Sequence, residues 1–150
     1  MPEPVLRLLH VENDENDRFF LQRAIQSSMP AIRLTSAADG EQALAMLKGR
    51  GAEQPDLVLL DIRMPLMDGF EFLQRFMALE DIKQIPVMMF STSGQAQDVK
   101  RARELGATAY VIKPHTVSEL RQFVQRLYAK WQSNELSTEW PDAPEPGHPI

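Results

Sequence analysis

The chain has 150 residues, of which 43% are hydrophobic and 25% charged, and its formal net charge is −5 at pH 7. This length and composition indicate one soluble globular domain with some additional chain. The negative charge argues against nucleic-acid binding, which depends on clustered lysine and arginine, and the absence of cysteine excludes disulfides, thiolate metal sites and cysteine nucleophiles. Without a signal peptide or a long apolar run, we expect a cytoplasmic protein that does not enter a membrane.

Hydrophobic periodicity predicts five strands that alternate with five helices. The expected strands are short apolar runs at residues 5–11, 32–37, 57–60, 87–90 and 109–112. Four of the helices are expected to start at a polar capping residue, which is Asp14, Asp39, Asp68 or Thr116, and the fourth helix in the chain is expected to start near Gln95. Gly106 is well suited to end that fourth helix in a left-handed conformation.

This alternation predicts an α/β fold with a doubly wound parallel sheet, helices on both faces and right-handed crossovers. In such sheets ligands bind beyond the carboxyl ends of the strands. Five polar residues follow the ends of predicted strands: Glu12, Asn13, Asp61, Ser91 and Lys113. We therefore expect these five side chains to gather at one end of the sheet.

The chemistry of these residues suits a divalent cation and a phosphoryl group. Glu12, Asn13 and Asp61 offer the hard oxygen ligands that Mg²⁺ requires. Lys113 could neutralise a transferring phosphoryl group, the Ser91 hydroxyl could donate to one of its oxygens, and Asp61 could be the nucleophile. The five residues together therefore favour a phosphoryl-acceptor site.

Each residue also has a simpler interpretation. The acids after the first strand could form a solvated helix start, which is how we interpret Asp14 and Asp17. Asp61 could be a turn residue and Lys113 an exposed lysine. His10, within the first strand, is interpreted as a buried histidine with satisfied hydrogen bonds. The simpler interpretation is favoured for each residue alone, but not for five residues at consecutive strand ends.

Four segments of the sequence resemble the receiver domain of response regulators. They are Leu-Leu-His-Val-Glu-Asn-Asp at 8–14, Leu-Val-Leu-Leu-Asp-Ile-Arg-Met-Pro-Leu-Met-Asp-Gly at 57–69, Ile-Pro-Val-Met-Met-Phe-Ser-Thr-Ser at 85–93 and Gly-Ala-Thr-Ala-Tyr-Val-Ile-Lys-Pro at 106–114. They occur in matching order, and the resemblance extends over about residues 5–133. It implies the flavodoxin-like (βα)5 fold with strand order 2-1-3-4-5.

The resemblance also implies a role for each site residue. Asp61 would accept a phosphoryl group from a histidine kinase, and Ser91 and Lys113 would bind its oxygens. Tyr110 would be the switch aromatic, moving inward when Ser91 shifts toward the phosphoryl group. The output would be a two-state change in the face made by the fourth helix, fifth strand and fifth helix. Such a protein is not an enzyme beyond phosphoryl transfer to its own Asp61 and autodephosphorylation.

The resemblance implies a Mg²⁺ site as well. Asp61, the side chain at position 13 and the main-chain carbonyl of Arg63 would hold the ion, with Glu12 acting through water. The Lys113–Pro114 bond is expected to be cis.

Asn13 departs from the family pattern, in which this position carries a carboxylate. Its side-chain oxygen can still bind a metal, but one negative charge is missing, so we expect weaker Mg²⁺ binding and a phosphorylation that needs more Mg²⁺. The alternative is a pseudo-receiver, a binding or scaffold module that does not cycle through phosphate. An aspartate-nucleophile phosphatase fits poorly because Arg63 lies where it needs a second acid, and a dinucleotide-binding domain lacks its glycine motif.

Beyond the receiver domain, assigned to residues 1–133, residues 134–150 form a proline-rich extension. The prolines argue against regular structure there. Tyr128, Trp131, Leu136 and Trp140 are apolar anchors that a purely disordered tail would not need. With the long loop 49–55, this extension is similar to that of single-domain regulators paired with bacterial and cyanobacterial phytochromes. The similarity implies a bacteriophytochrome-type kinase partner and a homodimer in which the extension is a dimer arm.

Overall fold

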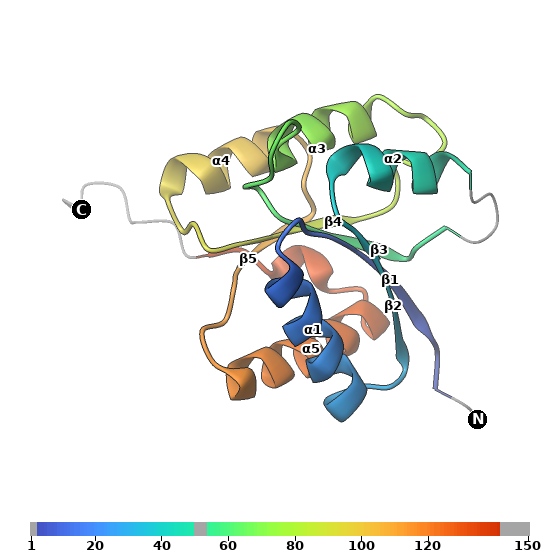
Figure 1. The fold of residues 1–150 in the computed structure, drawn as a ribbon, viewed down its shortest axis with the longest axis vertical. Coiled ribbons are helices and arrows are strands. Elements are labelled where there is room, and N and C mark those ends of the chain that lie inside the picture. Colours follow the sequence, from blue (N-terminus) through green and yellow to red (C-terminus); the bar gives the residue numbers. More distant parts are fainter. Residues whose placement is uncertain (1–2, 50–53, 142–150) are drawn as a thin grey trace.

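The computed structural model describes residues 3–49 and 54–141; most of the loop 49–55 and residues 142–150 of the extension lie outside this part. Five strands form one parallel sheet in the order β2-β1-β3-β4-β5 (Figure 1). The strands are β1 (Leu6–Val11), β2 (Ile32–Ala37), β3 (Leu57–Leu60), β4 (Val87–Ser91) and β5 (Ala109–Ile112). The flavodoxin-like α/β fold and its strand order, predicted from the sequence, are confirmed.

Among the described residues, five α-helices connect or follow the strands. They are α1 (Glu15–Ser28), α2 (Gly40–Lys48), α3 (Gly69–Met77), α4 (Ala96–Glu104) and α5 (Val117–Gln132). Each of the four predicted capping side chains accepts a hydrogen bond from the backbone N–H three residues further on, at 2.8–3.0 Å; these are Asp14, Asp39, Asp68 and Thr116. Gly106, with φ of 99°, follows the C-cap of α4 in the left-handed region, as the sequence predicts.

The helices cover both faces of the sheet, with α2, α3 and α4 on one side and α1 and α5 on the other (Figure 1). Successive side chains of a strand point to opposite faces, so Leu9 and Val11 of β1 join the cluster under α2–α4, while Leu6 and Leu8 join the cluster under α1 and α5. All four residues of β3 are buried, as expected for a central strand covered on both faces. Parallel strands between two helical layers bring all their carboxyl ends to one edge.

The start of the C-terminal extension folds back over β5. A single 3₁₀ turn, η2 (Leu136–Thr138), follows α5, although the sequence argued against regular structure in this segment. The Tyr110 N–H donates to the Glu139 carbonyl at 2.8 Å, and the Trp140 indole N–H donates to the Thr108 carbonyl at 3.1 Å. Because β5 is an edge strand, these bonds occupy backbone groups that would otherwise be open to another chain.

The extension also crosses from one face of the sheet to the other. Leu136 is buried in the cluster under α1 and α5, and Trp140 packs against the cluster under α2–α4. The Arg103 guanidinium of α4 lies 4.3 Å from the centre of the Trp140 ring, and Lys130 of α5 lies 3.6 Å from the Glu139 carboxylate. The predicted apolar anchors Leu136 and Trp140 therefore attach the extension to its own domain.

Within the described ranges, none of the helices has the length and apolar character needed to cross a membrane.

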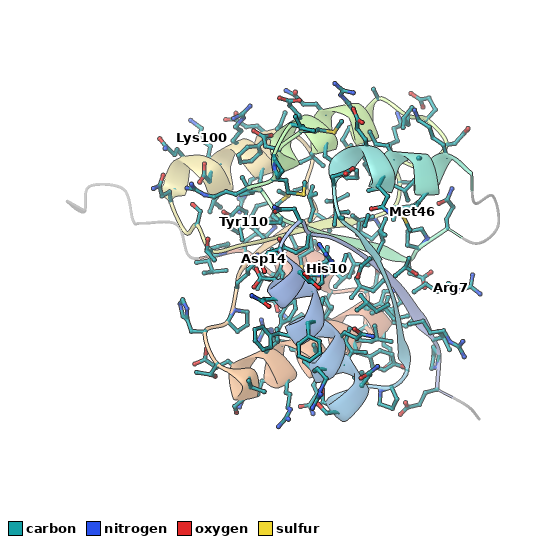
Figure 2. All side chains as sticks on the ribbon, in the orientation of Figure 1. Arg7, His10, Asp14, Met46, Lys100 and Tyr110 are labelled. Atoms are coloured by element: carbon teal, nitrogen blue, oxygen red, sulfur yellow. The ribbon has the colours of Figure 1, made fainter. Side chains whose placement is uncertain are left out.

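His10 is fully buried in the middle of the sheet, on the side that faces α1 (Figure 2). Its ring meets Phe90 edge to face, with ring centres 6.1 Å apart. Neither ring nitrogen has a hydrogen-bond partner in the part of the chain that the structure describes, so the expectation of a satisfied histidine is wrong. Burial, together with the charges of Lys113 and Arg18, lowers the pKa of His10 to about 3, so its ring is neutral in the folded protein.

We expect His10→Leu to raise the free energy of unfolding by about 1–2 kcal/mol at pH 7, because the variant removes two buried polar atoms that lack partners. Urea denaturation monitored by circular dichroism measures this change. His115→Leu, at an exposed histidine, is the matched control and should change stability by less than about 0.5 kcal/mol.

The lowered pKa of His10 also predicts that the free energy of unfolding depends on pH. Below the ordinary histidine pKa of 6.5 the unfolded chain binds a proton that folded His10 does not bind, so the wild type loses up to about 1.4 kcal/mol of stability per pH unit down to its folded pKa of about 3. His10→Leu should lack this part of the acid sensitivity. Equal stability and equal acid sensitivity in wild type and His10→Leu would contradict a neutral, unpartnered His10 in the folded protein.

Candidate functional site

Asp61 directly follows β3 and is buried, with only 6% of its surface exposed. The loop between β3 and α3 turns back on it, since the Gly69 N–H donates to the Ile62 carbonyl at 2.8 Å. A Cβ added to Gly69 would lie 2.3 Å from the Asp61 carbonyl oxygen, which no other residue could accommodate without moving the backbone. The two residues of the Asp-Gly pair at 68–69 thus have separate structural roles. Asp68 caps α3, and Gly69 lets the helix start against the Asp61 backbone.

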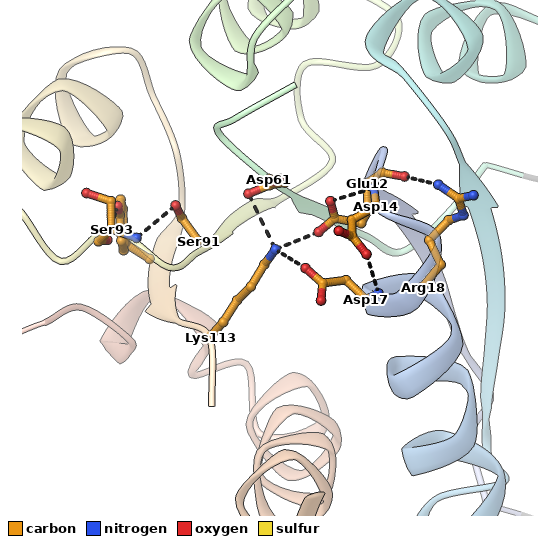
Figure 3. Close-up of polar contacts among 9 residues, drawn as sticks. Glu12, Asp14, Asp17, Arg18, Asp61, Ser91, Ser93 and Lys113 are labelled. Carbon is orange, nitrogen blue, oxygen red and sulfur yellow. Dashed lines mark hydrogen bonds and ion pairs between the residues drawn. The ribbon is translucent and has the colours of Figure 1, made fainter. Parts of the chain in front are cut away.

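Lys113, just beyond β5, directs its ammonium group toward three carboxylates (Figure 3). Its Nζ lies 2.6 Å from Glu12 Oε1, 2.8 Å from Asp17 Oδ2 and 3.6 Å from Asp61 Oδ1. The first two contacts are charge-assisted hydrogen bonds, whereas the third is an ion pair whose atoms are too far apart for a hydrogen bond. The structure therefore brings together Glu12, Asp61 and Lys113 from three different strand ends.

Burial changes the pKa values of Glu12 and Lys113. Burial raises the pKa of Glu12 to about 7, although the hydrogen bond from Lys113 opposes the shift. For Lys113, burial disfavours the charge, but hydrogen bonds to Asp17 and Glu12 and the nearby Asp61 carboxylate outweigh burial and raise its pKa above the ordinary lysine value. Lys113 is therefore a permanent cation beside Asp61.

Asp17 is a site residue that the sequence interpretation missed. We expected it to be a solvated acid at a helix start, and Asp14 does act in that way, as the N-cap of α1. The Asp17 side chain, 41% exposed, instead pairs with Lys113 across the site. A signal was present in the sequence, because a capping Asp14 puts Asp17 at the third helical position, whose side chain points back toward the strand end.

The proposed metal ligands are less tightly arranged. Asn13 and Arg63 are exposed, and neither side chain makes a hydrogen bond or ion pair with another residue in the described ranges 3–49 and 54–141. In those same ranges, no group of three or more His, Cys, Asp or Glu residues is placed to hold a metal. The available donors are the Glu12 and Asp61 carboxylates, the Asn13 amide oxygen and the Arg63 carbonyl, which are all hard oxygens and fit Mg²⁺ in kind.

A second missed residue, Ser93, connects the site to the rest of the molecule. The Ser93 N–H donates to the buried Ser91 Oγ at 3.2 Å, and its own hydroxyl donates to Asp98 of α4 at 2.6 Å. The Tyr110 hydroxyl of β5 donates to the Ser93 carbonyl at 2.6 Å. Ser93 thereby joins Ser91 to both α4 and β5.

Tyr110 lies inside the fold, on the side of α3 and α4, with only 1% of its surface exposed (Figure 2). Burial raises the pKa of its hydroxyl, so the hydroxyl remains a donor at neutral pH. The ring is thus already in an inward position in this structure, while its backbone N–H pairs with the C-terminal extension.

The peptide bond between Lys113 and Pro114 is trans, since the described residues contain no cis peptide bond, and the expectation of a cis bond is wrong. A trans bond is the intrinsic preference of an X–Pro peptide.

The fold, with its strand order β2-β1-β3-β4-β5, is that of a response regulator receiver. The model of the response regulator receiver domain family matches residues 8–125, and the chain belongs to this family.

Its relatives include single receivers and longer proteins. Response regulator Rcp1 of Synechocystis sp. is 31% identical over 83% of this chain and 87% of its own length. The structure of Mn²⁺-bound Rcp1 superposes with a TM-score of 0.73 and 30% identity, over 92% of this chain and 99% of that one. The phosphorylated cyanobacterial phytochrome response regulator RcpA gives a TM-score of 0.76 with 30% identity over 87% of this chain and 96% of that one. The probable transcriptional regulator ycf27 of Cyanophora paradoxa is 33% identical over 88% of this chain, which spans about half (52%) of that relative.

We expect Asn13→Asp to tighten Mg²⁺ binding by about tenfold, because a carboxylate adds a full negative charge to the ligand set. Isothermal titration calorimetry with MgCl₂ measures the dissociation constant. Asn16→Asp, which adds the same charge in the first turn of α1, is the matched control and should have a much smaller effect. An unchanged Mg²⁺ affinity in Asn13→Asp would show that position 13 does not bind the ion.

Proposed function

We propose that this response regulator accepts a phosphoryl group on Asp61 from a sensor histidine kinase in a two-component phosphorelay. The observation that carries the proposal is the buried Asp61 carboxylate beside the permanent Lys113 cation, at the end of β3. A buried carboxylate and a fixed ammonium at one strand edge are the components of a phosphoryl-acceptor site.

In the proposed reaction, an Asp61 oxygen attacks the phosphorus of a phosphohistidine, and the N–P bond breaks as the new O–P bond forms. Lys113 lies close enough to neutralise negative charge on the phosphoryl oxygens, and the Ser91 hydroxyl could donate to one of them. Mg²⁺, when bound by the Glu12–Asn13–Asp61–Arg63 donor set, supplies further charge neutralisation. The chain would catalyse this transfer to itself and the later loss of the phosphoryl group, and no other reaction.

The proposed output passes through Ser93. A Ser91 hydroxyl that turns toward a phosphoryl group would give up its bond from the Ser93 N–H, and Ser93 holds both Asp98 of α4 and Tyr110 of β5. Tyr110 in turn holds Glu139 of the extension through its backbone N–H. The signal would thus reach the face made by α4, β5 and α5, together with the extension that covers the edge of β5.

A protein donor suits the surroundings of the site. A groove next to Lys113 includes Phe20 of α1 and Val117 of α5, which are 49% and 56% exposed. Apolar surface of this kind beside an acceptor residue fits a protein partner. We infer a phytochrome-type kinase as the donor, which the similarity to the phytochrome response regulator RcpA supports.

The second candidate function is a pseudo-receiver, a binding module that does not carry phosphate. Asn13 favours it, because the site has one carboxylate fewer than a receiver is expected to have next to the acceptor, and its Mg²⁺ affinity should be lower.

Intact-mass measurement after incubation with acetyl phosphate and Mg²⁺ separates the two candidates. We expect the wild-type chain to gain one phosphoryl unit and Asp61→Asn to gain none, because an amide replaces the nucleophilic carboxylate in the variant. A wild-type chain whose mass does not change at saturating Mg²⁺ would favour the pseudo-receiver.

We also propose that the receiver, residues 1–133, forms a homodimer through α4, β5 and α5, and that the extension, residues 134–150, contributes to it as an arm. Because residues 136–140 cover the edge of β5, their removal would change the surface on which such a dimer forms. Light scattering should find a dimer for the full chain and a monomer for a chain ending at Ser133. A dimer that survives this truncation would rule out a role for the extension.

A further inference from the structure

Asp17 has no part in the reaction proposed above, yet it makes one of the two shortest contacts of Lys113. Its Oδ2 accepts a hydrogen bond from the Lys113 ammonium at 2.8 Å, between residues 96 positions apart in the chain. The side chain of Lys113 is only 11% exposed, so this contact is shielded from water on the lysine side. An ion pair in such surroundings is stronger than one on an open surface.

The local hydrogen bonds explain why Asp17 is free to reach Lys113. In a capping box, a Glu or Gln side chain at the position of Asp17 accepts the N–H of the capping residue. Here Glu12 Oε2 takes the Asp14 N–H instead, at 3.1 Å. The Asp14 side chain still caps the helix through the Asp17 N–H at 3.0 Å, so the Asp17 carboxylate has no local partner to satisfy.

The position of Asp17 also bears on the missing charge at Asn13. When Glu12 and Asp61 are both ionised, their two charges and the Lys113 ammonium leave one net negative charge at the site. With the Asp17 carboxylate the net charge of the site becomes −2. A carboxylate at position 13 would give the site the same net charge without Asp17. Asp17 approaches from the first turn of α1, whereas position 13 lies just beyond β1.

We propose that Asp17 is a positioning residue for Lys113 and that its carboxylate supplies the negative charge that Asn13 does not. Glu12 and Asp17 hold two of the three ammonium hydrogens, which leaves the third on the side of Asp61. Asp17 acts through Lys113 and through its charge, and does not touch the reacting atoms. The inference rests on the proposed function of Asp61 as the phosphoryl acceptor.

The test compares Asp17→Asn with Glu15→Gln in the full chain at pH 8. Both variants remove one acid from the first turn of α1, but Glu15 is exposed and makes no ion pair with a residue that the structure describes. Two readouts are taken without phosphorylation: the Mg²⁺ dissociation constant from calorimetry, and the side-chain ammonium signal of Lys113 in ¹⁵N-lysine NMR spectra, assigned by its absence in Lys113→Ala.

We expect Asp17→Asn to weaken Mg²⁺ binding by about fivefold to tenfold and to remove the Lys113 ammonium signal through faster hydrogen exchange. Glu15→Gln should change the affinity by less than about twofold, because the Glu15 charge is exposed and screened by solvent, and should keep the signal. The double variant Asn13→Asp/Asp17→Asn should regain the wild-type Mg²⁺ affinity without regaining the Lys113 signal.

An Mg²⁺ affinity that Asp17→Asn and Glu15→Gln change equally would overturn the charge role, and a Lys113 signal that persists in Asp17→Asn would overturn the positioning role. Failure of the proposed function is a separate result, because it shows as a wild-type chain that gains no phosphoryl unit. Neither of the two readouts depends on that reaction.

Discussion

The burial of one ammonium group is the constraint on which the rest of the site depends. Lys113 is nearly enclosed, and a buried cation is stable only where carboxylates surround it closely. Its partners come from the end of β1, the first turn of α1 and the end of β3, so one side chain ties together segments that are far apart in the sequence. A cation already fixed beside Asp61 needs no rearrangement to meet an incoming phosphoryl group, which is the electrostatic basis of the proposed reaction.

The same constraint gives the amide at position 13 a different meaning. Considered alone, Asn13 suggests a receiver that has lost its metal site. Considered with Asp17, it suggests that a negative charge has moved from the end of β1 to the first turn of α1, where the carboxylate also fixes Lys113. The Asp14 N–H donates to Glu12, so the Asp17 carboxylate is left to accept from Lys113. The choice between a receiver and a pseudo-receiver therefore depends on one question. It is whether the Asp17 carboxylate can support Mg²⁺ binding in place of a carboxylate at position 13.

Local sequence signals determined most of the fold. Strand ends and helix caps follow from short apolar runs and from side chains such as Asp39 and Thr116 that bond to the nearby backbone, and parallel topology then brings Asp61 and Lys113 to one edge. What the sequence did not predict depends on long-range contacts. The pairing of Glu139 and Trp140 with the edge of β5 cannot be recognised from proline content. The direction of Asp17 depends on its contact with Lys113, 96 positions away in the chain, and the missing partners of His10 depend on three adjacent strands.

In the proposed phosphorylated state, Lys113 and Ser91 converge on a phosphoryl group carried by Asp61. A crystal structure of the full chain with Mg²⁺ and beryllofluoride, which mimics an aspartyl phosphate, tests it most directly. We expect beryllofluoride bound to Asp61, with the Lys113 ammonium and the Ser91 hydroxyl in contact with its fluorine atoms and Asp17 still bonded to Lys113. An Asp61 carboxylate without bound beryllofluoride, at saturating Mg²⁺ and with Lys113 still held by Glu12 and Asp17 alone, would contradict it.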